Sequence, residues 1–163
     1  MKKLSLSLLS LFLFIGCTSY QPTGLTGGYS EIQLGENIFQ VSFRGNGYTS
    51  SERAADFCLL RCAELALEKG YNYFAIVESE KTSKTSTYTT PTNSSTSINV
   101  YPSGSHIYGN SQTKTTGGET YTVSKPRSTN IIICFKDKNE VDGIVYEVGY
   151  IIPSIKQKYN INN

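Results

Sequence analysis

The chain has 163 residues, of which 15 are basic and 13 acidic, with four cysteines and one histidine. This length suffices for one domain, and the near balance of charge without a basic patch excludes an ordinary nucleic-acid-binding surface. One histidine and the absence of a Cys-x-x-Cys pair provide no set of metal ligands, so we expect neither a metal nor a cofactor.

The first 16 residues have the pattern of an export signal. Lys2 and Lys3 precede residues 4–15, an apolar run that only serines interrupt. Because a helix needs about 20 residues to span a bilayer, this run predicts a signal peptide over residues 1–16 rather than a permanent span. Its removal takes away two of the 15 basic residues and leaves 13, which equals the number of acidic residues.

The end of this signal resembles the lipobox of bacterial lipoproteins. Residues 13–17, LFIGC, place a small residue before a cysteine, although Phe14 stands where the lipobox usually has Leu. The resemblance implies cleavage between Gly16 and Cys17, and attachment of acyl chains such as palmitate to Cys17. Two or three such chains anchor a protein stably. By the same resemblance, Thr18 favours the outer membrane facing the periplasm; an ordinary secretory signal with an incidental cysteine is the alternative.

Residues 17–28 are polar and contain Pro and Gly, which is typical of a flexible tether. We therefore expect a lipidated tether over residues 17–28 and a single domain over residues 29–160. Within that domain, Phe39, Val41 and Phe43 alternate with polar residues. This alternation predicts a half-buried strand over residues 38–44.

Residues 49–70 predict one long helix. Thr49 and Glu52 fit a capping box at its start, and Gly70 fits the left-handed residue that closes a helix. One wide face carries mostly small residues, which favours close packing on a sheet. Phe57, Leu60 and Leu67 fall instead among the charged residues. Either these three form a contact patch for a partner, or the tether or the last helix covers them.

After the helix, residues 72–79, NYFAIVES, predict a second strand. It should run parallel to the first strand through a right-handed crossover, either adjacent to it or with one strand between. Residues 82–116 contain 18 Ser or Thr among 35 and show no apolar period. We expect a flexible loop there, mobile over residues 88–112, with strand edges continuing on either side. The tyrosines in it, Tyr88, Tyr101 and Tyr108, suggest an adhesive surface for a glycan or a protein.

Two further strands are predicted at residues 119–125 and 130–136, with a turn at Pro126 and Arg127 between them. The last segment is ambiguous from its residues alone. Residues 144–148 fit a strand, whereas residues 145–159 show the 3-4-3-4 apolar spacing of a helix. Pro153 would kink that helix.

The three remaining cysteines are Cys58, Cys62 and Cys134. Cys134 lies on a strand that the helix face should cover, so a disulfide from Cys62 to Cys134 is one alternative, and three small buried thiols are the simpler one. A cysteine or serine nucleophile needs a base, and His106 stands alone in the expected loop. We therefore expect no catalytic residues.

Residues 27–77 resemble a family of uncharacterised bacterial lipoproteins. The resemblance rests on GGYSE at residues 27–31, VxFxGN followed by TS at residues 41–50, LLRxAE at residues 59–64 and GYxxF at residues 70–74. The family has a variable low-complexity middle and a short C-terminal helix, which implies a helix over residues 145–159. Glu147 and Val148 depart from the Asp-Ala pair that often opens that helix. The resemblance implies no activity.

The expected fold is α+β, with a mainly antiparallel four-stranded sheet in β-α-β-β-β-α order and both helices packed on one face. The expected function is that of a membrane-anchored envelope lipoprotein that binds or supports without catalysis. One alternative is an accessory subunit of an envelope complex. Another is a hydrolase of envelope polymers, which would need paired carboxylates. The nearest acidic pairs are Glu78 with Glu80 and Glu140 with Asp142.

Overall fold

The computed structural model describes residues 19–138 and 143–161. Its elements are β1 (Gly28–Gln33), β2 (Ile38–Arg44), α1 (Ser51–Glu68), β3 (Tyr73–Thr89), β4 (Asn93–Ser103), β5 (His106–Thr116), β6 (Thr120–Phe135), β7 (Tyr146–Glu147) and α2 (Val148–Tyr159). The fold is α+β and mostly antiparallel, as expected. The described residues form seven strands in two sheets, however, so the expected single four-stranded sheet is wrong.

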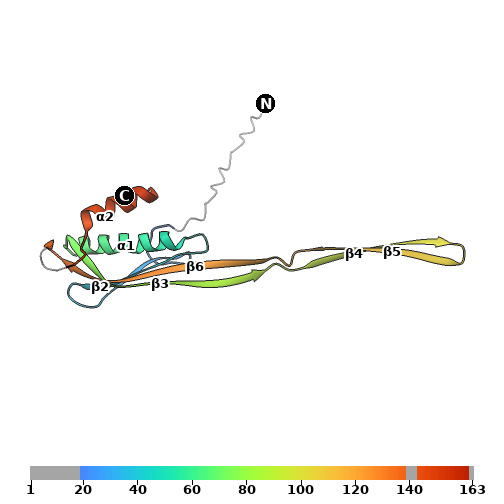
Figure 1. The fold of residues 1–163 in the computed structure, drawn as a ribbon, viewed down its shortest axis with the longest axis horizontal. Coiled ribbons are helices and arrows are strands. Elements are labelled where there is room, and N and C mark those ends of the chain that lie inside the picture. Colours follow the sequence, from blue (N-terminus) through green and yellow to red (C-terminus); the bar gives the residue numbers. More distant parts are fainter. Residues whose placement is uncertain (1–18, 139–142, 162–163) are drawn as a thin grey trace, which may run out of the picture.

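The larger sheet has five strands in the order β1-β2-β6-β3-β7, and each neighbouring pair is antiparallel. Strands β2 and β3 are therefore parallel to each other with β6 between them, which is one of the two predicted arrangements. Both helices lie on the same face of this sheet (Figure 1). Between helix and sheet lies one core, which includes Phe39, Val41, Phe43, Phe57, Phe74 and Ile132.

Helix α1 begins one residue later than a Thr49 cap would place it. Ser50 is the N-cap, and its hydroxyl accepts a hydrogen bond from the Arg53 amide at 3.1 Å. Thr49 instead accepts from the Asn46 amide at 2.9 Å and so closes the preceding turn. The predicted end is confirmed, because Gly70 has a φ of 80° and its amide donates to the Leu67 carbonyl at 2.9 Å.

The expected turn at Pro126 is wrong, because Pro126 lies inside the continuous strand β6. The carbonyl of Pro126 accepts from the Gly45 amide at 2.8 Å, so this side of the residue faces the end of β2. In a strand, the N–H and C=O of one residue point to the same side. Proline has no N–H to donate, and its nitrogen faces the side of β6 where β2 has already ended. The backbone hydrogen bonds between β6 and β3 are therefore unaffected.

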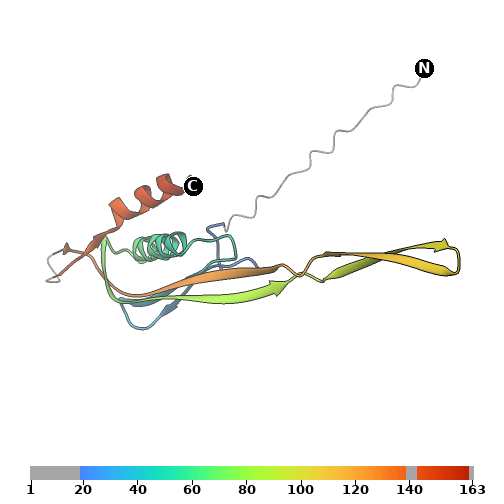
Figure 2. The same ribbon diagram turned by 45° about the vertical axis from the view of Figure 1, so that its right-hand side comes forward.

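Within the Ser/Thr-rich stretch of residues 82–116, β3 continues to Thr89, so the strand edge expected there is confirmed. The expected mobile loop over residues 88–112 is wrong, because β4 and β5 form a two-stranded antiparallel sheet that we call the arm. The arm extends away from the helices as a continuation of the β3–β6 ribbon (Figure 1, Figure 2). Gly104 supplies the positive φ of 62° that a two-residue hairpin turn favours.

A bulge in β3 explains the change of character along that strand. The pairing with β6 shifts between Ile76 and Glu78, so Val77 is an extra residue. Successive side chains of a strand point to opposite faces of the sheet. One extra residue therefore reverses the face to which each later side chain of β3 points. Phe74 is buried in the core, whereas Glu78 and Glu80 line the face of the sheet opposite the helices.

The C-terminal segment is a helix, as the resemblance implied. Helix α2 spans Val148–Tyr159 and contains Pro153, and the two residues before it form the short edge strand β7. Val148 and Ile155 are its buried residues.

Candidate functional site

The predicted cleavage and lipidation residues, Gly16 and Cys17, lie outside the described residues. Much of the expected tether is nevertheless packed on the domain. The ring of Tyr20 contacts the rings of Tyr29 and Phe57, with centroids 5.1 and 5.5 Å apart, and its hydroxyl donates to Glu64. Residues 20–28 therefore do not form a free linker, and only two residues separate Cys17 from Tyr20.

The predicted contact patch does not exist as a surface. Phe57 and Leu60 are 1% and 0% exposed, and only Leu67 is exposed. Phe57 is covered by Tyr20 from the N-terminal segment and by Tyr159 from α2, whose ring centroid lies 5.0 Å away. The second reading of these residues, in which the tether or the last helix covers them, is thus confirmed for Phe57.

The three cysteines are free and buried, so the disulfide from Cys62 to Cys134 is not formed. Burial raises the pKa of the Cys134 thiol to about 12 and raises that of Cys62 well above its usual value. Cys58 donates from its sulfur to the Val41 carbonyl at 3.4 Å. The pKa of Cys58 is instead lowered, chiefly by its hydrogen bond with Cys62. All three thiols are at most 1% exposed, so a substrate cannot reach them.

Arg61, which is only 7% exposed, lies at the centre of a network of charged side chains. Arg61 donates to Glu31 through Nε at 2.8 Å and Nη2 at 2.7 Å, and to Glu68 through Nη1 at 2.7 Å. Its guanidinium lies over the ring of Tyr29, 4.6 Å from the centroid. Hydrogen bonding from Arg61 holds the pKa of the Glu31 carboxyl below its usual value.

This network also reaches α2 and the N-terminal segment, because Lys156 bonds Glu64 at 3.1 Å and Tyr20 donates to the same carboxylate. Burial, followed by the hydrogen bond to Glu64, raises the pKa of the Tyr20 hydroxyl. Every partner is a side chain of the domain itself. The network therefore locks β1, α1, α2 and the N-terminal segment together, and it presents no reacting group.

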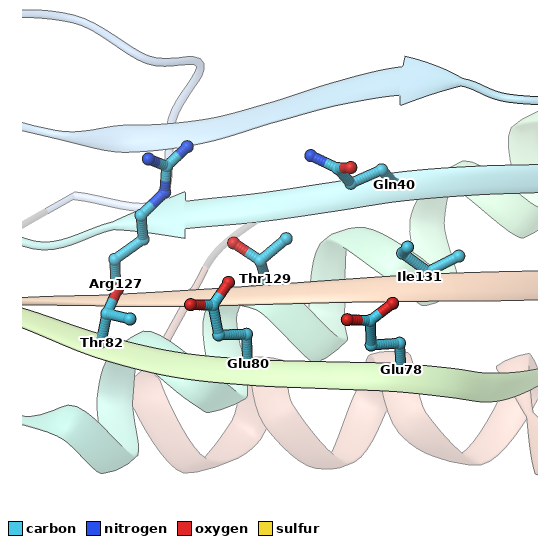
Figure 3. A pocket seen from close by; sticks show the side chains of 7 residues that line it. All are labelled: Gln40, Glu78, Glu80, Thr82, Arg127, Thr129 and Ile131. Atoms are coloured by element: carbon cyan, nitrogen blue, oxygen red, sulfur yellow. The ribbon is translucent and has the colours of Figure 1, made fainter.

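The acidic pair Glu78 and Glu80 lies on the sheet face that the helices leave open. Both side chains point away from the sheet in the same direction, Glu80 beside Thr129 and Glu78 beside Ile131 (Figure 3). They line a hollow of about 300 Å³ whose charged side chains are all exposed. Two carboxylates that act on a glycosidic bond flank that bond, whereas Glu78 and Glu80 both project from β3, on one side of this hollow. Glu140 and Asp142 lie outside the described residues.

Next to this hollow is a groove of about 510 Å³ that we call the basic groove. Four cations line it, namely Arg44 from β2, Lys84 from β3, and Lys125 and Arg127 from β6, and no carboxylate does. Arg44 lies directly opposite Arg127 in the pairing of β2 with β6. Lys84 lies directly opposite Lys125 in the pairing of β3 with β6.

This groove has no signal in the sequence, because its cations are far apart along the chain. Finding them together requires the register of the β3–β6 hairpin, and the expected turn at Pro126 had cut that hairpin short. Leu25, which is fully exposed, also lines the groove and belongs to the packed N-terminal segment. The backbone carbonyl of Gly24 accepts from Arg44 at 3.0 Å, which fixes the segment to the groove.

The arm exposes every side chain that the structure describes in it. Val100 pairs with Gly109 and Pro102 with Ile107, so apolar residues gather on one face near the tip. Tyr101 pairs with Tyr108 on the opposite face. His106, the only histidine of the chain, is exposed at the tip. The arm thus combines an apolar face, an aromatic pair and two open strand edges.

Within residues 19–138 and 143–161, no three His, Cys, Asp or Glu side chains gather in a way that would hold a metal ion. None of the helices in these ranges has the length and hydropathy required to cross a bilayer. No protein-family model matches the chain, and neither the curated proteins nor the solved structures include a significant match.

Proposed function

We propose that this chain is a lipid-anchored protein of the bacterial envelope that acts by binding or support, without catalysis. The N-terminal pattern that ends at Cys17 is the basis for the anchor, and the outer membrane facing the periplasm is the proposed location. The packed segment at Tyr20 supports an anchor that leaves the domain close to the bilayer, since only two residues separate Cys17 from Tyr20.

The arm is the observation that carries a binding role. An isolated two-stranded hairpin is at best marginally stable in water, because it has no second layer on which to bury its side chains. Ile98, Val100 and Ile107 are 67%, 57% and 77% exposed. Open strand edges that carry few charges also offer hydrogen bonds to another chain. A protein maintains such an arm when another molecule covers it.

An accessory subunit of an envelope complex is the specific form of this function that the arm favours. The contact surface is then the arm, since Phe57 and Leu60 of the earlier candidate patch are buried. Tyr101 and Tyr108 supply rigid aromatic contacts, which are frequent in binding surfaces.

Site-specific crosslinking in intact cells tests this proposal. A photo-crosslinking residue replaces Tyr101 or Tyr108 on the arm, or Tyr150 on α2 as a control of the same residue type. These tyrosines are 60%, 62% and 71% exposed, so all three are equally open to solvent. We expect discrete crosslinked products from the two arm positions and none from Tyr150. Equal yields from all three positions, or none from the arm, would contradict a binding role for the arm.

A further inference from the structure

We propose that the basic groove binds the surface of an anionic bilayer. This inference rests on the lipid anchor proposed at Cys17, because the anchor brings the groove to the membrane. The ligand chemistry is the phosphate diester of an anionic phospholipid, presented as a surface rather than as a free ion.

Positive charge is concentrated in the basic groove. Without residues 1–16 the chain carries 13 basic and 13 acidic residues, so it has no net attraction for anions. Four of those 13 cations nevertheless line one groove, and within the described residues none of the four forms an ion pair with a carboxylate. Like charges directly opposite each other on neighbouring strands are destabilising. An anionic ligand removes that repulsion.

The proposed anchor at Cys17 is close to the domain. Cys17 precedes Tyr20 by three residues, and an extended chain spans at most about 3.6 Å per residue, so the thiol lies within roughly 10 Å of Tyr20. Tyr20 belongs to the segment that runs alongside β1, where the Tyr29 amide donates to the Gln21 carbonyl at 2.9 Å. The same segment ends in the turn of Gly24 and Leu25 at the groove. Tyr20 itself packs on Phe57 of α1, on the helix side of the sheet, and the turn at Gly24 brings the segment to the groove on the other side. An acylated Cys17 therefore keeps this end of the domain, with the groove, close to the bilayer.

The groove combines an apolar side chain with its cations. Leu25 is fully exposed among the four cations. An apolar side chain that enters the headgroup region beside cations that meet lipid phosphates is the usual combination at a peripheral membrane surface. The acidic pair Glu78 and Glu80 lines the neighbouring hollow, which shares Arg127 with the groove, and neither carboxylate lines the groove itself.

Vesicle binding by an unlipidated chain tests the proposal. A chain that starts at residue 18 keeps every described residue and lacks the thiol, so its binding is independent of acylation. It is mixed with vesicles of phosphatidylcholine alone, or with added phosphatidylglycerol, and the bound fraction is measured by sedimentation. We expect binding only to the phosphatidylglycerol vesicles at 0.15 M salt. At 1 M salt, where the Debye length falls from about 8 to about 3 Å, the binding should be lost.

Two double variants locate the surface. Lys84→Gln with Lys125→Gln removes two cations of the groove, and Lys81→Gln with Lys114→Gln removes two exposed lysines that do not line it. One cation near an anionic surface accounts for about a fivefold change in binding. We expect the first variant to bind about 25-fold more weakly and the second to bind like the parent chain. All four positions are exposed, so both variants should keep the parent circular dichroism spectrum.

The proposal would be overturned if both variants lost binding to the same extent, or if the parent chain bound both kinds of vesicle equally. It would also be overturned if inorganic phosphate competed with the vesicles at constant ionic strength, because the groove would then be a site for a free anion. A failure here leaves acylation of Cys17 unaffected, because that is measured on the natural N-terminus. Conversely, a chain that is not acylated would still show this binding in vesicles.

Discussion

Arg61 of α1 and Glu31 of β1 are joined by two parallel hydrogen bonds, from Nε at 2.8 Å and from Nη2 at 2.7 Å. Their side chains are 9% and 33% exposed, so most of this ion pair is shielded from water. Glu31 lies in the segment GGYSE and Arg61 in the segment LLRCAE. We infer that these two segments direct the docking of the N-terminal strand on the helix, because Glu31 and Arg61 meet only when β1 is in place.

The first prediction follows from this pair. Glu31→Gln leaves the buried guanidinium with a neutral partner, and a hydrogen bond between charged groups contributes about 1.5–3 kcal/mol. We expect the free energy of unfolding, measured in urea, to fall by about 1–3 kcal/mol. Glu68→Gln is the matched control, since Glu68 also bonds Arg61 but is 54% exposed. Its loss should stay below about 1 kcal/mol, and equal losses would contradict the account.

The second prediction concerns pH. The bond from Arg61 lowers the pKa of Glu31 in the folded protein below its usual 4.5. A carboxyl with a lowered folded pKa stabilises the fold above its unfolded pKa, and that stabilisation is lost as the pH falls through the folded pKa. The difference in unfolding free energy between the parent chain and Glu31→Gln should be constant above about pH 5.5 and shrink below pH 4.5. A difference that grows on acidification would refute this role.

The third prediction concerns the N-terminal segment. Tyr20→Ala removes a ring that packs on Phe57 and Tyr29, and it should lower the free energy of unfolding by about 2–4 kcal/mol. Tyr20→Phe keeps the ring and loses only the hydrogen bond to Glu64, so about 1 kcal/mol is expected. Limited proteolysis should then cut residues 19–28 in the Ala variant but not in the Phe variant. If neither substitution changed the free energy of unfolding, the segment would be a free tether.

The sequence predicted the parts of this fold in which local pattern and tertiary packing agree. Helix α1 and strand β2 have clear periods, and Gly70 ends the helix because a residue with positive φ was needed there. Strand β1 was missed because GYSEIQ is an edge strand with few apolar residues. The bulge at Val77 exchanged the two faces of β3, which made its continuation resemble a loop.

The candidate sites depended on tertiary structure still more strongly. Phe57 lies among charged residues on the helical wheel, but Tyr20 and Tyr159 cover it. The basic groove joins Arg44 to Lys84 and Lys125, and no local pattern relates positions so distant in the chain. The three serine- and threonine-rich strand segments have high β-propensity from threonine, yet their polar composition hid the hairpin.

The fourth prediction is that the arm contributes nothing to the stability of the domain. Replacing residues 90–119 by Asn-Gly joins β3 to β6 through a two-residue hairpin turn. Because the described side chains of β4 and β5 are all exposed, the free energy of unfolding should change by less than about 0.5 kcal/mol. The crosslinks described for Tyr101 and Tyr108 would be lost with the arm. A large destabilisation would show that the arm packs on the domain.

The fifth prediction concerns the cysteines, in a Cys17→Ser background so that only Cys58, Cys62 and Cys134 contribute. All three are buried and free. A thiol reagent should react slowly with the folded protein and then label three thiols per chain in urea, without a reductant. One labelled thiol in urea would instead indicate a disulfide between two of them.

The mass of the N-terminal peptide from protein purified out of bacterial membranes tests the central claim most directly. The account predicts a peptide that begins at Cys17 and carries two or three acyl chains on its first residue, together with loss of membrane retention in Cys17→Ser. A peptide that begins at any other residue without acyl chains, or full membrane retention of Cys17→Ser, would contradict it.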